Sequence, residues 1–316
     1  MAGNTYGSHN VQCGRSHTDL PRKTPRMTDS LMCTLGHVAT TRQLANRGIS
    51  TERISAALQA GRIQRLRRGI YGCAHADKRT ARAASVGGAL TCVSLLRESG
   101  VWAGTSRTIH VQLPPGTARP ISADLTSHWE RPRFPMESKW RAGRLQAMWR
   151  AIHCLDEENA IAALESALHE RYLSGKDIHR IALHAPRRLH PGVDNLERNS
   201  GSGNETIVRR RLQSAGFSVS AQPYVPGMGH EDLLVEECVG LDIDGRQWHG
   251  EDRYEIDHDR DLHVEGLGRH VLRISTSQIH STWPTTLAVI ERVVNDAIQE
   301  RDRRRGRILV LRDDPI

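Results

Sequence analysis

The chain has 316 residues and a formal net charge of +8, with 44 lysines and arginines against 36 acidic residues. This length favours two domains, each large enough to bury a core of its own. No run of about 18 apolar residues occurs and the N-terminus has no apolar signal core, which excludes a transmembrane helix; we expect a cytoplasmic protein.

The two halves of the chain differ in charge. Residues 1–199 hold 29 lysines and arginines against 16 acids, a balance of +13, whereas residues 200–316 hold 15 against 20, a balance of −5. The basic part has the polarity of a protein that binds a polyanion. The alternative is a composition that is rich in arginine for reasons unrelated to binding.

Cysteine usage favours a reducing compartment. Six cysteines are present: Cys13, Cys33, Cys73, Cys92, Cys154 and Cys238. They are scattered without C-x-x-C spacing, so the sequence predicts neither a disulfide framework nor a zinc site.

The chain is predicted to begin with a disordered lead-in, residues 1–30, which are rich in Gly, Ser, Thr, Arg and Pro. From Leu31 the apolar spacing predicts three short helices, with Gly48 and a Ser50 or Thr51 cap between the last two. Residues 61–71 then alternate apolar side chains with arginines, the pattern of a β-wing. Residues 31–75 are therefore predicted to form a winged helix.

In a winged helix the second helix of the pair, here about residues 51–60, enters the major groove while wing arginines meet phosphates. The sequence resembles the N-terminal domain of AbiEi-type antitoxins, through Val38-Ala-Thr-Thr-Arg-Gln-Leu44, Gly48-Ile-Ser50 and Gly61-Arg-Ile-Gln-Arg-Leu-Arg-Arg-Gly-Ile-Tyr71. The resemblance implies a repressor that binds the DNA of its own operon. The alternatives are a protein-docking winged helix and an ordinary solvated basic face. The predicted DNA-contacting residues, one of them in the C-terminal half, are Arg53, Arg65, Arg67, Arg68 and Arg209.

Residues 76–189 are predicted to be a mixed helical extension of this antitoxin-like region. The expected elements are a small-residue helical region at 81–100, a strand at 107–113, a proline-rich loop at 114–135, and helices at 145–153 and 157–172. The stretch shows no catalytic constellation, and its histidines are predicted to be isolated: His110, His128, His153 and His169.

A linker is predicted at residues 190–204, where Pro, Gly, Asn and Ser cluster and the charge balance changes sign. Beyond it, residues 205–300 predict the order αβββαβα, followed by a tail at 301–316. The helices are expected at 205–215, 257–266 and 286–300, and the outer strands at 217–225 and 270–275.

The middle two strands form an acidic hairpin. Two apolar segments, residues 233–235 and 239–243, are joined by a short turn. Asp242 and Asp244 share one face because side chains alternate along a strand. Asp232 lies opposite Asp242 if the loop has an odd number of residues, for example Glu236 to Cys238, whereas a two-residue turn would break the cluster.

Three carboxylates on one face predict a bound cation, because each would otherwise raise the pKa of the others. Asp232, Asp242 and Asp244 offer the hard oxygen ligands that suit Mg²⁺ or Mn²⁺. His249 could act as a base or an extra ligand, which together gives the means for metal-assisted hydrolysis of a phosphodiester. Glu205 is a further candidate for this site, although Ser202-x-x-Glu205 also matches a capping box.

The same residues resemble a known family over about residues 200–298. Asp232, Asp242-Ile-Asp-Gly-x-x-Trp-His249, Asp257-x-x-Arg-Asp261 and Gly268-x-x-Val-Leu-Arg273 look like the nuclease-like domain related to very-short-patch-repair (Vsr) endonucleases, in the PD-(D/E)xK superfamily. The resemblance implies a metal-dependent DNA nuclease core with Asp232 as the shared metal ligand. The superfamily's lysine is absent, and Asp244 occupies its place.

The predicted fold class is thus α+β or α/β in two domains, a winged helix-turn-helix with a helical extension and a restriction-endonuclease-like core. The predicted function is a Mg²⁺-dependent DNA endonuclease in phage defence or DNA repair, targeted by the winged helix. The alternative is a non-enzymatic antitoxin-type repressor with a degenerate nuclease domain. Besides DNA, a second copy of the chain or a cognate toxin-like protein is an expected partner, and a membrane is not.

Overall fold

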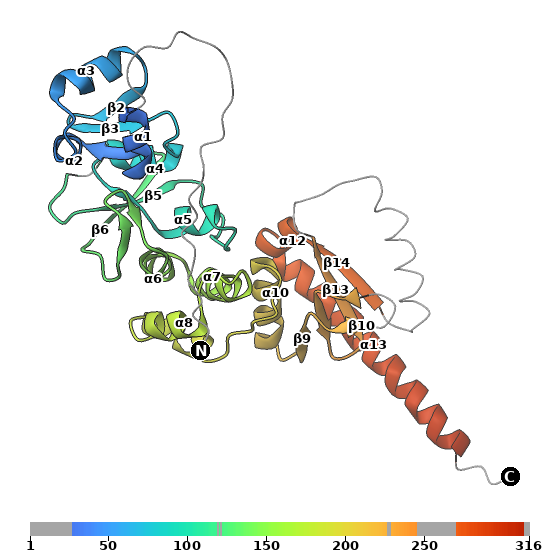
Figure 1. Ribbon diagram of the computed structural model, residues 1–316. Helices are drawn as coiled ribbons and strands as arrows, with labels where there is room; N and C mark the ends of the chain where they lie inside the picture. The colour runs from blue at the N-terminus through green and yellow to red at the C-terminus, as the bar shows by residue number, and fades with distance from the viewer. Residues whose placement is uncertain (1–26, 119, 121, 226–228, 245–269, 313–316) are drawn as a thin grey trace, which may run out of the picture.

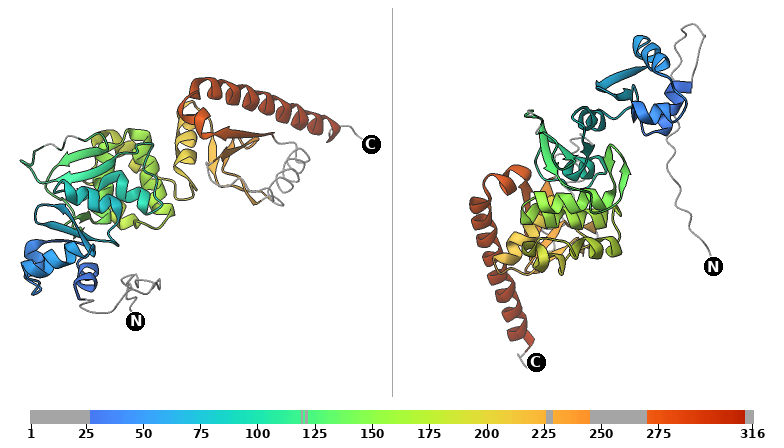
Figure 2. Two further views of the ribbon diagram at one scale, coloured as in Figure 1. Left: turned by 90° about the horizontal axis from the view of Figure 1, so that it is seen from above. Right: turned by 90° about the vertical axis from the view of Figure 1, so that its left-hand side faces the viewer.

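The computed structural model describes residues 27–118, 120, 122–225, 229–244 and 270–312. The described chain is a mixed α and β structure with four sheets, three of which belong to successive units with their own buried clusters. Figure 1 shows these units following one another through the molecule, in blue, green and orange. The views in Figure 2 confirm that the middle unit separates the two outer ones.

The N-terminal unit contains three helices and a three-stranded sheet. Its elements are α1 (Met27–Thr34), β1 (Val38–Thr40), α2 (Thr41–Ala45), α3 (Thr51–Gln59), β2 (Ile63–Arg67) and β3 (Ile70–Cys73). The sheet order is β1-β3-β2, and β2 and β3 form an antiparallel hairpin. α2, α3 and the hairpin lie where the sequence places them. β1 was not predicted, and α1 overlaps the end of the predicted lead-in, whose residues 1–26 lie outside the described part.

Local sequence explains the helix boundaries in this unit. The Thr40 hydroxyl accepts a hydrogen bond from the Gln43 backbone and the Gln43 side chain accepts one from Thr40, so α2 begins with a capping box. Gly48, at φ 76°, turns the chain after α2, and Ser50 caps α3.

The middle unit is built around a five-stranded sheet with order β6-β5-β4-β8-β7. Its elements are α4 (Lys78–Ser85), β4 (Ala89–Leu90), α5 (Cys92–Glu98), β5 (Ile109–Leu113), β6 (Leu125–Trp129), β7 (Met136–Ser138), β8 (Arg141–Ala142), α6 (Arg144–Cys154), α7 (Glu157–His169), α8 (Gly175–Ala182), the 3₁₀ turn Arg187–Leu189 and α9 (His190–Val193). The prediction of a mixed helical extension included β5, as a strand at 107–113, but missed the other strands, because three of them have only two or three residues and β6 lies in the proline-rich stretch.

The first two units meet along a small apolar cluster. Val38 and Ile70 of the N-terminal sheet pack with Ala84 of α4 and Trp140, and all four are buried. The N-terminal unit therefore packs against the middle unit through one face of its sheet, which leaves α3 at the outer tip (Figure 1).

The C-terminal unit has a four-stranded sheet with order β14-β13-β12-β9. Its elements are α10 (Gly203–Ser214), β9 (Val219–Ala221), β10 (Tyr224–Val225), β11 (Gly229–His230), β12 (Leu233–Val235), β13 (Val239–Asp244), β14 (His270–Ser275), α12 (Thr276–His280) and α13 (Trp283–Arg312). β9, β12 and β13 are antiparallel, whereas β14 is parallel to β13. The predicted helix at 257–266 falls in residues 245–269, outside the described part, and the predicted tail is helical as far as Arg312.

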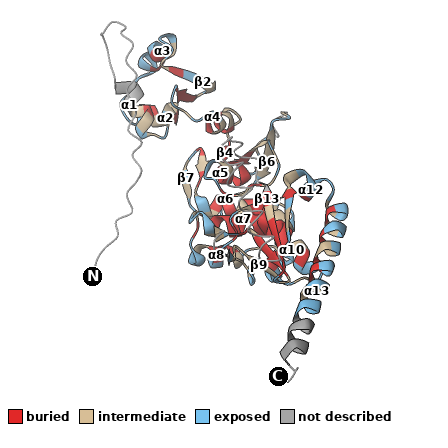
Figure 3. Ribbon diagram, turned by 90° about the vertical axis from the view of Figure 1, so that its right-hand side faces the viewer, coloured by how far each residue is buried: buried red, intermediate tan, exposed pale blue. Residues whose placement is uncertain are grey.

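The predicted linker does not separate the last two units in space. Residues 190–193 form α9, and Ser200 is only 1% exposed. α10 lies against α7, and the backbone of Gly203 touches the Trp102 ring so closely that a Cβ there would overlap it. Figure 3 shows buried residues concentrated on α7 and α10, so the middle and C-terminal units share one packed seam.

Candidate nucleic-acid interface and acidic site

The exposed tip of the N-terminal unit is strongly basic. Residues 31–75 contain seven arginines and a single acid, Glu52, a net charge of +6. α3 and β2 lie side by side at this tip in Figures 1 and 3. α3 buries Ile54 and Ala57 against the core and leaves Arg53 exposed, so one helix both anchors the unit and presents a cation.

The wing carries two further free-standing cations. Arg65 and Arg68 are exposed, and the Arg65 guanidinium lies 6.0 Å from the centre of the Tyr71 ring, which supports its position. Arg67 is different, because its Nη1 donates a hydrogen bond of 3.0 Å to the carbonyl of Val86 and packs beside Gly87. Arg67 thus also contacts the middle unit, and its predicted contact with phosphate stays a prediction.

Arg209 is buried and forms an ion pair inside the molecule. It is 5% exposed, and its Nη2 lies 2.6 and 2.8 Å from the two carboxylate oxygens of Glu165 on α7. The prediction of a phosphate contact was wrong because three consecutive arginines on one helix cannot all face solvent when the helix packs into a seam. Arg211, two positions on, pairs with Glu158 at 2.6 Å.

Of the two registers that the sequence left open, the acidic hairpin has the one with an odd loop. Val235 pairs with Val239 and Leu233 with Leu241, so the loop is the three-residue segment Glu236 to Cys238. Glu236 and Glu237 adopt left-handed backbone conformations, with φ of 51° and 58°. Continuing the register by one residue sets Asp232 opposite Asp242, on the side of the sheet facing away from the core residues Leu233 and Leu241.

A polar network holds Asp232 at the end of β12. Its Oδ2 accepts a 2.7 Å hydrogen bond from the backbone of Ile243, and its Oδ1 lies 3.3 Å from Gln222 Nε2. The same amide donates to Glu205 Oε2 at 2.9 Å. Gln222 thus bridges the two carboxylates and lowers the cost of placing like charges near each other.

Glu205 faces this network and does not close a capping box. Ser202 accepts from the Glu205 backbone at 3.2 Å, but the Glu205 carboxylate accepts from Gly201 N at 2.8 Å and from Gln222. Burial raises the pKa of Glu205, and the charge of Asp232 raises it further. Glu205 is therefore an acid whose protonation depends on its neighbour.

The metal-binding prediction rests partly on residues outside the described part. Asp242 is half-buried, with its Oδ2 3.9 Å from Arg273 Nε on the neighbouring strand β14. β13 reaches Asp244, but the Asp244 side chain and all of His249 lie outside the described residues. Among the described carboxylates no three have oxygens within 4.8 Å of one another, so a hard-cation site here would need ligands from Asp244 or beyond.

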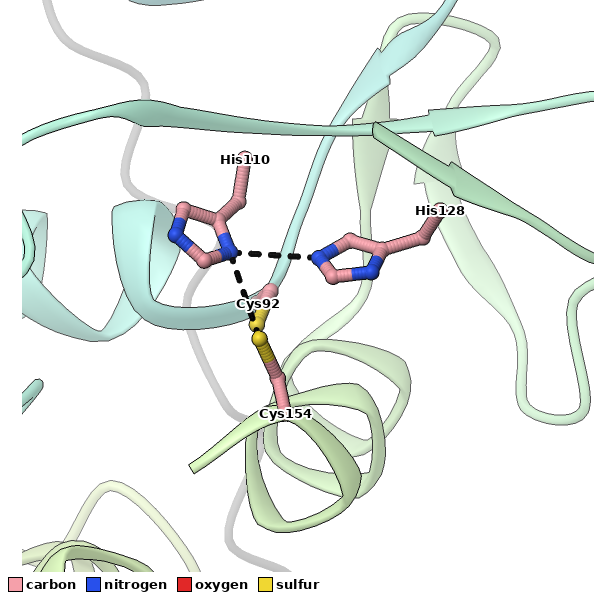
Figure 4. Close-up of side chains that lie close together, drawn as sticks. All are labelled: Cys92, His110, His128 and Cys154. Atoms are coloured by element: carbon pink, nitrogen blue, oxygen red, sulfur yellow. Dashed lines mark hydrogen bonds between the residues drawn. The ribbon is translucent and has the colours of Figure 1, made fainter. Parts of the chain in front are cut away.

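The sequence did not predict a sulfur and nitrogen cluster in the middle unit. His110 and His128, expected to be isolated, lie 3.1 Å apart between Nδ1 and Nε2, and Figure 4 shows Cys92 and Cys154 pointing at the same spot. The four ligand atoms all lie within 4.8 Å of one another. No short spacing signals this group because each residue comes from a different strand or helix.

Comparison with known proteins identifies one segment. Residues 35–72 match a family model described as a transcriptional regulator, AbiEi antitoxin. These residues span β1, α2, α3 and most of the wing, so the matched class is that of transcriptional regulators.

No curated protein matches the chain. Among solved structures, the RV2827C protein from Mycobacterium tuberculosis aligns with 60% of this chain and 83% of its own, at 15% sequence identity and a TM-score of 0.28. Of the helices that the structure describes, none is both long and apolar enough to cross a membrane.

Proposed function

We propose that the protein is a DNA-binding transcriptional regulator of the AbiEi antitoxin type. The observation that carries the proposal is the coincidence of the matched family segment with an exposed tip whose only acid is Glu52. In this proposal α3 enters the major groove with Arg53 near base edges or phosphates. Arg65 and Arg68 of the wing contact the phosphate backbone.

The wing and α3 are proposed to make different contributions to DNA binding, because their cations lie at different positions. Phosphate contacts by Arg65 and Arg68 would supply affinity that falls with salt, because each contact releases condensed counterions. Contacts from α3 would supply sequence preference, since only the groove carries the base code. By the same family analogy, a cognate toxin-like protein is a partner of the remaining surface.

The test measures binding of the full chain to duplex DNA from upstream of its own coding sequence. Fluorescence anisotropy reports the affinity at a series of salt concentrations. We expect this duplex to be bound on the order of 10³-fold more tightly than a shuffled one. Arg65→Ala and Arg68→Ala should each reduce the salt slope by about 0.9. Arg180→Ala, an exposed arginine on α8 in the middle unit, is the matched control and should leave both quantities unchanged. Equal affinity for the two duplexes would refute the proposal.

A second candidate function is metal-dependent hydrolysis of DNA by the C-terminal unit. It is favoured by the hairpin register that faces Asp232 with Asp242, and by Glu205 beside them. In this proposal Asp232, Asp242 and Asp244 would hold Mg²⁺ or Mn²⁺, which would supply charge neutralisation and an activated water. Gln222 and the backbone of Ile243 orient the Asp232 carboxylate, and His249 would accept a proton from the attacking water.

Plasmid nicking with Mg²⁺ or Mn²⁺ separates the two candidates. If the C-terminal unit is a nuclease, the wild type nicks, Asp232→Ala and Asp244→Ala abolish nicking without loss of DNA binding, and Glu237→Gln, an exposed acid in the hairpin loop, nicks normally. If the wild type binds its DNA but never nicks it, or if the variants nick as well as the wild type, the nuclease proposal is refuted and only the regulator proposal remains.

A further inference from the structure

Four side chains from four elements converge at one edge of the middle unit (Figure 4). Cys92 begins α5, His110 lies on β5, His128 on the neighbouring strand β6, and Cys154 ends α6. Cys92 and His110 are buried, whereas His128 and Cys154 lie nearer the surface. The group therefore joins the interior of the unit to its edge, and it plays no part in the acidic site or the basic tip.

The four ligand atoms are close enough together to surround one tetrahedral metal ion. Tetrahedral Zn²⁺ with bonds of about 2.0–2.1 Å to nitrogen and about 2.3 Å to sulfur separates its ligands by about 3.3–3.8 Å. Here His110 Nδ1 lies 3.1 Å from His128 Nε2 and 3.8 Å from Cys154 Sγ. Since no pair of ligand atoms exceeds 4.8 Å, closure around one ion needs shifts of about 1 Å or less.

The surrounding hydrogen bonds are compatible with the tautomer that a metal requires. The other ring nitrogen of His110, Nε2, lies 3.4 Å from Ser106 Oγ, and the His110 backbone donates to Ser94 Oγ at 2.8 Å. A proton on Nε2, donated to Ser106, leaves Nδ1 free to bind a cation, which is how second partners orient metal-bound histidines. Ser106 is itself held by Thr108 at 3.1 Å.

Charge also favours a divalent ion over hydrogen bonding alone. A bound cation would deprotonate the coordinating thiols. Two thiolates and two neutral imidazoles then balance a 2+ charge, so a buried ion would carry no net charge into the core.

We propose that Cys92, His110, His128 and Cys154 form a structural zinc site. All four coordination positions are filled by side chains, which leaves no open position for a substrate and distinguishes the site from a catalytic one. The ion would tie the outer strand β6 and the end of α6 to α5. It would thereby stabilise the middle unit, against which the N-terminal unit packs.

The experiment measures metal content of the full-length protein, purified under reducing conditions without chelator. A second group of three potential ligands, Cys33, His37 and Cys73, lies in the N-terminal unit. All measurements are therefore made in the Cys33→Ser/Cys73→Ser background, which removes both thiols of that group. We expect about one equivalent of zinc per chain by mass spectrometry, falling to near zero in Cys92→Ser/Cys154→Ser.

Co²⁺ added to the metal-free protein provides a second measurement that does not depend on how the zinc variants fold. The expected result is the visible absorption of tetrahedral Co²⁺ together with a thiolate charge-transfer band. His128→Asn, at a surface-near ligand, should shift or weaken the visible bands. Cys238→Ser, which changes a buried thiol in the C-terminal unit, should leave them unaltered.

Two results would overturn the proposal. One is zinc content far below one equivalent in the background protein together with no tetrahedral Co²⁺ spectrum. The other is zinc content that stays the same when Cys92 and Cys154 are both replaced. If zinc-free protein contains a disulfide between Cys92 and Cys154, the two cysteines pair with each other instead of binding metal, and this outcome also overturns the proposal.

Discussion

Arg209 and Glu165 form a two-point ion pair that is buried between α10 and α7. The guanidinium Nη2 lies 2.6 and 2.8 Å from the carboxylate oxygens, and the Glu165 side chain is 0% exposed. Thr206 Oγ1 and the backbone of Glu197 donate to the same carboxylate at 2.7 and 2.9 Å. The pair therefore fixes the C-terminal unit to the middle unit, and in the proposed regulator the surfaces for DNA and for a partner protein sit on one connected body.

Arg209→Ala should lower the free energy of unfolding by about 3–5 kcal/mol, because it leaves the Glu165 carboxylate buried without its cation. Urea denaturation of the full chain measures the change. Arg180→Ala is the control, since Arg180 pairs with Asp177 at 3.9 Å on the surface and should cost about 1 kcal/mol or less. Similar losses for the two variants would contradict the buried role of Arg209.

The hairpin register and the arginine run show what local sequence can and cannot determine. The apolar pattern of residues 231–243 limited the hairpin to two possible registers, and the structure has the odd loop that faces Asp232 with Asp242. Which of Arg209, Arg210 and Arg211 turns inward depends on where α7 lies. That position is set by packing between segments more than 40 residues apart, and no local pattern encodes it.

The buried acid Glu205 should make stability depend on pH. Its pKa is raised above the ordinary value of 4.5, first by burial and then by Asp232, so the folded state favours the protonated form. The stabilisation from this proton is fully present below pH 4.5 and is lost as pH rises through the raised pKa. Glu205→Gln keeps a side-chain oxygen that can accept hydrogen bonds from Gly201 and Gln222. As the pH rises through the raised pKa, the Glu205→Gln variant should become increasingly stable relative to the wild type.

Urea unfolding at a series of pH values measures this difference. Asp232→Asn should lower the Glu205 pKa only part of the way to its ordinary value, since burial is the larger cause. A carboxyl-carbon NMR titration of Glu205 in the two proteins reports the shift directly. If the free energies of unfolding of the wild type and Glu205→Gln differ by the same amount at every pH, the raised pKa of Glu205 is contradicted.

The cluster of Cys92, His110, His128 and Cys154 could not be found from a sequence motif. His110 and His128 are 18 residues apart and lie on parallel neighbouring strands, while the two cysteines come from helix ends on either side. Short ligand spacings arise when one turn supplies two ligands, and here no turn does. Of the two strands that carry the histidines, β5 was predicted but β6 lies in a stretch predicted to be a loop, so the sequence did not predict that the four side chains meet.

Arg67 and Arg65 should respond differently to substitution although both are exposed wing arginines. Arg65 is proposed to contact phosphate, so Arg65→Ala should reduce the salt slope of DNA binding by about 0.9. Arg67 is tied to the Val86 carbonyl, so Arg67→Ala should leave the slope nearly unchanged and instead loosen the N-terminal unit from the middle unit. Anisotropy titrations give the slopes, and hydrogen exchange of Val86 and its neighbours reports the loosening. A larger loss of slope for Arg67→Ala would place Arg67 on the DNA.

The capping box of α2 should control the stability of the tip that carries these contacts. α2 has only five residues, so the hydrogen bonds of 3.1 Å from Gln43 N to Thr40 Oγ1 and 2.9 Å from Thr40 N to Gln43 Oε1 satisfy much of its first turn. Thr40→Ala should cost about 1 kcal/mol, whereas Thr40→Ser, which retains the hydroxyl, should cost a few tenths. Thr51→Ala, at an exposed position of α3, is the control. Hydrogen exchange of the α2 amides in the full chain measures the local opening free energy, and equal exchange in the Ala and Ser variants would mean that the hydroxyl does not hold the helix.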